Sequence, residues 1–441
     1  MGRRPSVSTA AATQNHGIER RGPAGLPRLL ASLREDGRAE PLRSHVDRYG
    51  TVADAISGGA LVAEVEASGL AGRGGASFPT AVKLASVVGA RRRPVVVANG
   101  AEGEPASGKD RALLRTLPHL VLDGAVAVAD AVGARDVFVT VDGRAATERA
   151  ALEVALEERR RNRLDARMTI RITRAPTGFV TGEETALIQF LNGGPAKPTF
   201  TPPRPFERGV GGAPTLVQNV ETLAQLALIS RFGSDWFREV GTRDEPGSVL
   251  ATISGAVHRP GVYELALGAP STDVVAETGG LTGRVSGVLI GGYFGSWVAP
   301  DDFFRLRLLD SELATHRAAL GARAILALPD DTCAVGELAR VTRYLASESA
   351  GQCGPCVHGL DAIATAMERL ASGAADARPQ LERWIEMVRG RGACRHPDGA
   401  AGFVESALDV FADEIDLHLR YGRCRASTRG VLPLPTGNRK S

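Results

Sequence analysis

The chain has 441 residues, of which 43% are hydrophobic and 23% charged, with a formal net charge of +3. This length exceeds one ordinary hydrophobic core and predicts two to four domains. The near balance of 53 basic and 50 acidic residues gives no reason to expect a nucleic-acid partner, and the Arg runs at 91–93 and 159–161 are expected at solvated helix ends. No apolar run approaches the roughly 20 residues that span a bilayer, and no signal sequence opens the chain, so we expect a cytoplasmic protein.

The first forty residues are rich in Arg, Ser, Ala, Gly and Pro without a sustained period, which predicts a loosely ordered extension. From about residue 62 helical and strand patterns alternate. Helices are expected at 80–88, 110–131 and 145–161, and strands at 94–98, 137–141 and 168–172. This order predicts an α/β domain with a largely parallel sheet. Five prolines between 194 and 214 exclude regular structure there and indicate a surface loop.

A glycine-rich segment precedes the first of these helices and reads GRGGASFPTAVK over residues 72–83. Its glycines let the backbone approach a ligand closely, and Pro79 suits the first turn of a helix. Free N–H groups there, with Arg73 before them and Lys83 one turn into the helix, would bind a phosphate group. The spacing fits neither the Rossmann fingerprint nor the P-loop.

Three more polar turns have the same character. They are Asn99–Pro105 with Lys109–Arg111, then Gly182–Thr185, then Pro214–Thr222, each at the end of a predicted strand or the start of a helix. In an α/β fold such turns converge on one site.

In order and spacing, these four motifs resemble the FMN- and NADH-binding flavoprotein subunit of respiratory complex I, which is the F subunit of bacterial NADH-quinone oxidoreductase, and its relatives in hydrogenases and formate dehydrogenases. The resemblance runs from about Val62 to Leu419. It implies a Rossmann-like FMN-binding α/β domain at 62–240, a β-grasp (SLBB) domain at 246–330 and a helical-bundle iron–sulfur domain at 336–430. An N-terminal extension and lead-in (1–61) and a polar tail (431–441) would flank them. With no charged or catalytic cluster in it, the β-grasp domain is expected to be a structural spacer.

The resemblance also implies site residues. Those matching the family's FMN and dinucleotide positions are Gly72, Arg73, Gly74, Gly75, Phe78, Lys83, Asn99, Glu102, Gly182, Glu183, Glu184, Gln218 and Asn219. Glu104 and Glu184 match acidic residues on the nicotinamide side and are the expected catalytic groups. Ala101 stands where the family has aspartate, and Gln218 where it has asparagine.

The predicted adenine site departs further from the family pattern. Phe78 remains, but Ser86 and Arg204 stand where phenylalanines are usual, and Phe179 replaces a tyrosine. Base–aromatic stacking contributes on the order of 1–3 kcal/mol per base in nucleic-acid complexes, so two lost partners would weaken NADH binding. Arg204 could instead stack its guanidinium on the adenine or meet a phosphate.

Five cysteines in a cytosolic chain do not suggest a disulfide framework. Cys353, Cys356 and Cys394 match three of the four ligands of the family's [4Fe–4S] cluster, while Ala350 occupies the first position, where a methyl group cannot ligate iron. Three alternatives stay open. A cluster could form with a substitute ligand from Ser349, Cys333, an exogenous thiol or water; the site could hold [3Fe–4S]; or it could be empty or hold zinc. His358, at a helix start, is expected to be a surface residue.

The implied function is electron input: FMN accepts hydride from NADH, and electrons pass through the iron–sulfur cluster, an incomplete [4Fe–4S] site, to an iron–sulfur (ferredoxin-type) protein or to respiratory complex subunits. The chain would then be cytoplasmic, or peripheral at the inner face of the cell membrane through a complex. Two alternatives are a catalytically degenerate binding or assembly subunit, and an FMN oxidoreductase with another donor.

Overall fold

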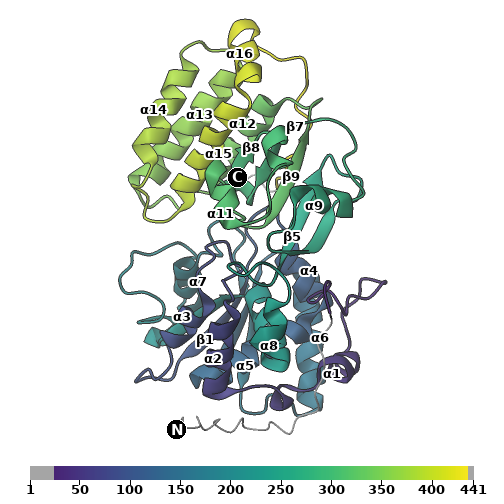
Figure 1. Cartoon of the computed structure of the whole chain (residues 1–441). Helices are drawn as coiled ribbons and strands as arrows, with labels where there is room; N and C mark the ends of the chain where they lie inside the picture. Colours follow the sequence, from purple (N-terminus) through teal and green to yellow (C-terminus); the bar gives the residue numbers. More distant parts are fainter. Residues whose placement is uncertain (1–23, 436–441) are drawn as a thin grey trace, which may run out of the picture.

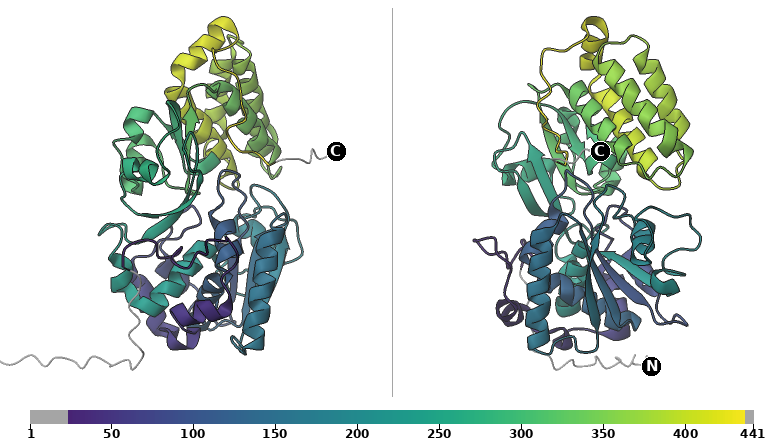
Figure 2. Two further views of the ribbon diagram at one scale, coloured as in Figure 1. Left: turned by 90° about the vertical axis from the view of Figure 1, so that its right-hand side faces the viewer. Right: turned by 180° about the vertical axis from the view of Figure 1, so that it is seen from behind.

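The computed structural model describes residues 24–435 as two stacked lobes (Figure 1). The lower lobe in that view is the α/β domain. The upper lobe contains the β-grasp domain and the helical bundle beside each other, an arrangement that the turned views also show (Figure 2). The boundary between the lobes is therefore where residues of all three parts can meet.

The α/β lobe is built on a four-stranded parallel sheet in the order β3-β2-β1-β4. The strands are β1 (Val95–Gly100), β2 (Asp136–Asp142), β3 (Thr169–Ala175) and β4 (Thr215–Asn219). Because successive side chains point to opposite faces, Val96 and Ala98 enter the main core while Val95 and Val97 enter a smaller core on the other face. Both faces are thus covered, as a parallel sheet requires.

Helices cover the two faces unequally. Those of this lobe are α1 (Leu42–Tyr49), α2 (Gly58–Ser68), α3 (Thr80–Ala85), α4 (Lys109–Thr116), α5 (Pro118–Val132), α6 (Ala146–Arg161), α7 (Glu184–Leu191) and α8 (Val220–Arg238). Helices α2, α5, α6 and α8 supply most of the main core, whereas α7 supplies Leu187 and Ile188 to the smaller one. The smaller core therefore lies beneath α7 and the proline-rich segment that follows it.

The single helix predicted at 110–131 is wrong. The chain forms two helices, α4 and α5, that meet at 96°. Pro118 is the first residue of α5, and Leu117 before it has φ −130° and ψ 48°, since proline removes a backbone donor and excludes the preceding residue from helical angles. Within residues 24–435 no single helix is long and apolar enough to cross a membrane, and only this bent pair meets those criteria jointly.

Two further predictions fail where polar residues become buried. Part of the predicted loose extension is packed against the α/β domain. Leu29 is fully buried, and the Arg28 guanidinium donates to the carbonyl of Trp236 at 2.6 Å. Residues 1–23 of the predicted extension lie outside the described part of the chain.

Arg159 is not on a solvated helix end. It is buried and pairs with Asp123 at 2.7 Å and Asp165 at 2.5 Å, while its neighbours Arg160 and Arg161 are exposed.

The β-grasp domain has a five-stranded mixed sheet in the order β6-β5-β9-β7-β8. Its strands are β5 (Ser248–Gly255), β6 (Gly261–Ala266), β7 (Val285–Ile290), β8 (Ser296–Val298) and β9 (Ala324–Pro329), with helices α9 (Ser271–Glu277), α10 (Pro300–Phe303) and α11 (Asp310–Leu313). Only the central β5–β9 pair is parallel.

The C-terminal helices are α12 (Ala334–Ser347), α13 (Leu360–Ala371), α14 (Ala377–Val388), α15 (His396–Val410) and α16 (Ala412–Tyr421), with a π-helical turn at Pro355–Gly359. Their apolar faces meet in one core that also takes in Trp297 and Leu326 of the β-grasp sheet. The segment predicted as a polar tail begins with packed residues, since Leu432 is fully buried; residues 436–441 are not described. The predicted fold class is confirmed.

Candidate functional site

The site lies at the carboxyl edge of the parallel sheet. Strand β1 has β2 on one side and β4 on the other, and all are parallel, so the order in which the chain adds strands changes direction between β1 and β4. Ligands of open α/β sheets bind in the crevice at such a switch point. The residues that end these two strands are Asn99 and Gly100 on β1, and Gln218 and Asn219 on β4.

The glycine-rich loop reaches this crevice from α2. The N–H of Arg73 donates to the hydroxyl of Thr222 in the first turn of α8 at 2.8 Å, and a Cβ on Gly74 would lie only 3.2 Å from that of Asn219. The N–H of Gly72 donates to the Phe78 carbonyl at 2.8 Å. Two of the N–H groups predicted for the phosphate are therefore used within the protein, whereas those of Gly74 and Gly75 make no hydrogen bond within the described residues.

Arg323, just before β9, holds the same loop from the β-grasp domain. Its guanidinium donates to the carbonyls of Arg73 at 2.6 Å and Gly72 at 3.1 Å. Burial, with the nearby charge of Arg323, lowers the pKa of Arg73 to about 10. The Nε and Nη2 of Arg73, and the Nε2 of Gln218, are buried donors that find no partner among residues 24–435. Buried polar groups are normally paired, so these donors, with the free N–H groups and the glycine cradle, fit an anionic, hydrogen-bonding ligand such as FMN.

A buried ionic group underlies the crevice. Lys109 lies 2.7 Å from Asp110 and 2.9 Å from Glu221, and its Nζ also donates to the Asn219 side chain at 3.3 Å. Asn219 caps α8 by accepting from the N–H of Glu221 at 3.0 Å and donates to Asp110 at 2.6 Å. Burial raises the pKa of Asp110 to about 6, against the opposing charge of Lys109. Asn219 is thus held rigidly from both sides.

The loop after β1 packs on the turn before α7. Asn99 donates to the Gly182 carbonyl at 2.8 Å, and a Cβ on Gly182 would lie 2.4 Å from the carbonyl oxygen of Ala101. Glu102, predicted to bind cofactor, accepts from the N–H groups of Asp110 and Arg111 at 3.2 Å each and so caps α4. Its carboxylate orients the loop in this structure.

The third motif presents two carboxylates with different partners. Glu183 caps α7 by accepting from the N–H groups of Thr185 and Ala186 at 3.0 Å each. Glu184 pairs with Lys83 of the first motif at 2.9 Å, and both side chains remain about one third exposed. Lys83 also donates to the Val217 carbonyl on β4 at 3.3 Å. The predicted phosphate-binding lysine is thus joined to a predicted catalytic carboxylate.

Glu104, the other predicted catalytic residue, joins the two lobes. Its carboxyl group accepts from the N–H of Ala106 at 3.0 Å and from that of Tyr293 in the β-grasp domain at 2.7 Å. Burial raises its pKa to about 7, above the ordinary 4.5, although both N–H groups favour the charged form. Glu104 therefore titrates near neutral pH at the boundary between the lobes.

Three of the positions predicted to stack the adenine lie at the surface. Phe78 is 46% exposed, and Ser86 and Arg204 are also exposed. A pocket of about 770 Å³ lies between α7 and the proline-rich segment, where Pro203 and Pro205 on either side of Arg204 help to line it. None of the predicted FMN residues lines this pocket. Phe179 instead packs on Phe294, with ring centroids 4.6 Å apart.

The three predicted iron ligands lie near one another in the bundle. Cys353 and Cys356 surround the start of the π-helical turn, and Cys394 immediately precedes α15. Burial raises the pKa of Cys394, and the charges of Cys356, Glu183 and Cys353 raise it further. This donor set fits a cluster held by three thiolates. Ala350 is only 4% exposed, so a buried methyl group stands at the predicted first ligand position.

The structure narrows the choice of a fourth ligand. Cys333 is excluded, since it caps the N-terminus of α12 while Ala350 follows its C-terminus, about 20 Å away along a 14-residue helix. Ser349 remains a candidate fourth ligand, because its hydroxyl group contacts the cysteine site by donating to the Cys356 carbonyl at 3.0 Å. His358 is exposed, as predicted.

A loop beside the flavin motifs contacts residues that flank the cysteines. The N–H of Phe179 donates to the carboxylate of Glu348 at 2.8 Å, two residues before Ala350. The Phe179 ring lies 5.7 Å from that of His396, two residues after Cys394. One loop thus contacts both flanks of the cysteine site and leads four residues later to Glu183.

Sequence reasoning missed several residues that build this site. Lys109, Asp110, Glu221 and Thr222 lie inside the motifs, and their charge or position beside matched residues was an available signal. Arg323 had no such signal, because it lies in another domain and reaches the loop only through the fold.

Three family models match the chain in the order of these parts. The Nuo51 FMN-binding domain matches residues 65–228, the SLBB domain residues 250–289, and the NADH-ubiquinone oxidoreductase-F iron-sulfur binding region residues 337–418. An NADH-quinone oxidoreductase F subunit of Rhizobium meliloti is 32% identical over 90% of this chain and 96% of its own. The mitochondrial NADH dehydrogenase [ubiquinone] flavoprotein 1 of Dictyostelium discoideum is 32% identical, over 81% of this chain and 78% of its own.

Among solved structures, an NAD⁺-reducing [NiFe]-hydrogenase in the H₂-reduced state superposes with a TM-score of 0.78 at 30% identity, over 87% of this chain and 67% of that one. Fold, site and comparisons define a modular flavoprotein with an FMN-binding domain, an SLBB domain and an iron–sulfur binding region. The chain belongs to the family of NADH-quinone oxidoreductase F subunits. The resemblance predicted from the four motifs is confirmed.

Proposed function

We propose that this chain is an FMN-dependent electron-input subunit that oxidises NADH and passes electrons through an iron–sulfur cluster to a partner protein. The contacts of Phe179 with Glu348 and His396 carry this proposal, because they join the loop that leads into the Gly182–Thr185 motif to residues that flank the cluster cysteines. Family membership supports the same activity.

FMN, when bound, supplies hydride acceptance and one-electron transfer. The protein would bind its phosphate through the free N–H groups of Gly74 and Gly75 and the unpaired donors of Arg73. Gln218 and Asn219 at the end of β4, and Asn99 at the end of β1, would fix its polar edge. The remaining predicted residues, Gly72, Glu102, Gly182 and Glu183, would shape the loops that hold these donors.

Glu184 is the better placed of the two predicted catalytic carboxylates. Its partly exposed pair with Lys83 leaves oxygen atoms free for a dinucleotide, whereas Glu104 already accepts from two backbone N–H groups. Phe78, which is exposed beside the glycine-rich loop, would contact the dinucleotide. Neither role requires a covalent protein intermediate.

The cluster would be held by Cys353, Cys356 and Cys394. Because Ala350 offers no ligand, a [4Fe–4S] cluster would keep one iron for Ser349, water or an exogenous thiol, and a [3Fe–4S] cluster would need no fourth ligand. The electron acceptor would be a ferredoxin-type iron–sulfur protein or another subunit of a complex, which would also decide whether the chain works in the cytoplasm or at the membrane surface.

Anaerobic turnover of NADH with ferricyanide tests the proposal on FMN-loaded protein. We expect steady turnover, a loss of activity in Glu184→Ala, and little change in a variant of an exposed carboxylate, Glu35→Ala. FMN-loaded protein that does not oxidise NADH would reject it.

A second candidate is a binding or assembly subunit without catalysis. The burial of a methyl group at the fourth ligand position favours it, as do the polar residues at positions 86 and 204. A protein that binds neither flavin nor iron after reconstitution would establish this alternative. A third candidate, a donor other than NADH, would show flavin reduction by another donor but not by NADH.

A further inference from the structure

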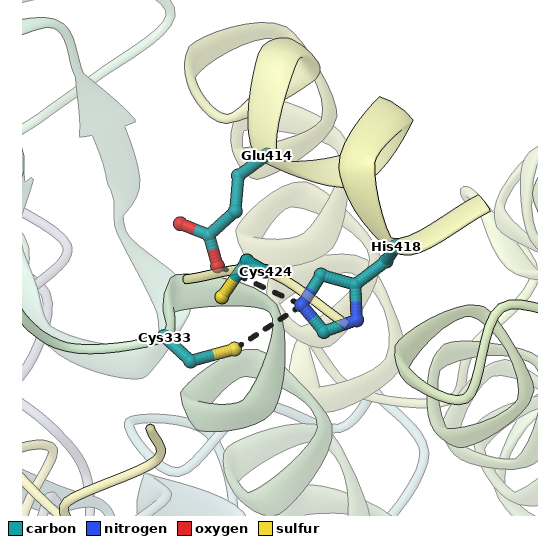
Figure 3. Close-up of side chains that lie close together, drawn as sticks. All are labelled: Cys333, Glu414, His418 and Cys424. Carbon is teal, nitrogen blue, oxygen red and sulfur yellow. Dashed lines mark hydrogen bonds and ion pairs between the residues drawn. The ribbon is translucent and has the colours of Figure 1, made fainter. Parts of the chain in front are cut away.

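A second group of metal-binding side chains lies in the bundle, away from the iron–sulfur residues. It consists of Cys333, Glu414, His418 and Cys424, whose ligand atoms all lie within 4.8 Å of one another (Figure 3). The Cys333 sulfur lies 3.3 Å from the Nε2 of His418, and the Glu414 carboxylate 4.0 Å from the same nitrogen. Two thiols, an imidazole and a carboxylate are ligand types that zinc takes in tetrahedral sites.

Three separate elements bring the four side chains together. Cys333 caps α12 directly after the β-grasp sheet. Glu414 and His418 lie one turn apart on α16 and so project from the same face. Gly422 ends α16 in a left-handed conformation, with φ +68°, and turns the chain so that Cys424 returns to the group.

Further hydrogen bonds orient the proposed ligands. The Nδ1 of His418 lies 2.7 Å from the Ala371 carbonyl, so it must carry the proton, and Nε2 therefore presents its lone pair to the group. The Cys333 sulfur accepts from the N–H of Gly336 at 3.2 Å, and Glu414 accepts from that of Val335 at 3.2 Å. Outer contacts of this kind are typical of built metal sites.

We propose that Cys333, Glu414, His418 and Cys424 form a structural zinc site. Four protein ligands would fill a tetrahedral zinc site and leave no open position, which favours a structural role over a catalytic one. Sulfur ligands also disfavour magnesium and calcium. A disulfide between the two cysteines would use only two of the four groups and would leave the orientation of His418 unexplained.

Zinc there would fix the segment that follows α16, over residues 427–433. The N–H of Cys333 donates to the Ser427 carbonyl at 3.1 Å, and Glu337 accepts from the N–H groups of Arg429, Gly430 and Leu432. The Pro433 carbonyl then accepts from the hydroxyl of Tyr293 at 2.6 Å. Because the backbone of Tyr293 also holds Glu104, the zinc site and the flavin crevice are joined by a continuous hydrogen-bonded segment.

Metal analysis of the full-length protein tests the proposal. We expect about one tightly bound zinc per chain, retained through gel filtration and lost in Cys424→Ser and His418→Gln. The matched controls are Cys353→Ser, which should lower iron but not zinc, and His258→Gln at an exposed position, which should change neither. Circular dichroism would check that each variant folds.

A second readout does not depend on variants. Wild-type protein stripped with a chelator should lose melting temperature and regain it with zinc, because metal binding is coupled to folding. Cobalt added to the stripped protein should give thiolate charge-transfer and tetrahedral d–d bands. Wild type without zinc and without these cobalt bands would overturn the proposal, as would a Cys333–Cys424 disulfide found by mass spectrometry in protein purified under reducing conditions.

Discussion

Glu104 shows how two domains together can determine the position and the pKa of one side chain. Its carboxyl group belongs to the loop after β1, yet one of its two backbone partners is Tyr293 of the β-grasp domain. Burial there raises its pKa from 4.5 to about 7. Between these two pH values the folded protein keeps a proton that the unfolded chain has already released. By linkage, this group lowers stability as the pH rises from about 4.5 to 7, and the loss is complete above pH 7.

Glu104→Gln should remove that pH dependence. The free energy of unfolding of the variant minus that of wild type should rise by about 2–3 kcal/mol from pH 5 to pH 8. This follows because wild type loses stability over that range and one pKa unit corresponds to about 1.4 kcal/mol. Chemical denaturation at both pH values measures this gain. The exposed Glu35→Gln is the control, and an equal difference from wild type at both pH values would contradict the assignment.

Ala350 is the residue that decides the nature of the cluster. With Cys353, Cys356 and Cys394 as ligands, a reconstituted cluster should lose one iron on oxidation and give the paramagnetic signal of [3Fe–4S]. Ala350→Cys should supply the missing thiolate and keep about four iron atoms per chain after the same treatment.

Iron and sulfide analysis with electron paramagnetic resonance compares the two proteins. Ala131→Cys, which adds a thiol on α5 in the other lobe, is the control. If wild type already retains four iron atoms after oxidation, Ser349 or another group is a firm fourth ligand. If neither protein binds iron, the cluster site has been lost.

At the scale of elements, the motifs predicted the crevice well because each ends a strand or starts a helix. In a parallel sheet those ends meet at one edge, so Asn99, Asn219 and the turn at Gly182 could be brought together from the sequence alone. Apolar periodicity continues through residues 110–131 and hides the break at Pro118. Nothing local showed that Arg28 and Leu29, inside the predicted extension, become buried. Those outcomes depend on tertiary contacts, which periodicity does not contain.

Gly74→Val tests the glycine-rich loop as an element. A Cβ there already approaches that of Asn219 at 3.2 Å, so the two added methyl groups should displace either the loop or the N-cap of α8. We expect the purified variant to retain less than about a tenth of the wild-type FMN, a loss equivalent to at least about 1.4 kcal/mol.

The control is Gly59→Val in α2, where a Cβ would contact nothing within 4 Å. Flavin is measured by fluorescence after heat release, and circular dichroism checks folding. Full flavin content in a folded Gly74→Val protein would exclude this loop from the flavin site.

For the whole molecule, the β-grasp domain is more than the spacer that its sequence suggested. Arg323 fixes the carbonyls of the glycine-rich loop, and Tyr293 holds Glu104, so two residues of the upper lobe shape a crevice in the lower one. The sequence could not predict these contacts because they join positions about 190 and 250 residues apart.

Arg323→Ala should weaken FMN binding at least about tenfold, because it removes two charged hydrogen bonds from the loop, each contributing about 1.5–3 kcal/mol. The control is Arg284→Ala on the same domain, whose side chain is 93% exposed. Quenching of flavin fluorescence gives both affinities. Equal affinities for wild type and Arg323→Ala would mean that the β-grasp domain does not support the flavin site.

An anaerobic titration of the reconstituted protein with NADH, followed by visible absorption, tests the central claim most directly. If the chain accepts electrons from NADH at FMN and passes them to a cluster, the flavin bands should bleach and the broad iron–sulfur absorption should fall within the same titration. A protein that stays colourless after reconstitution, or whose flavin bands persist in excess NADH, would contradict the account.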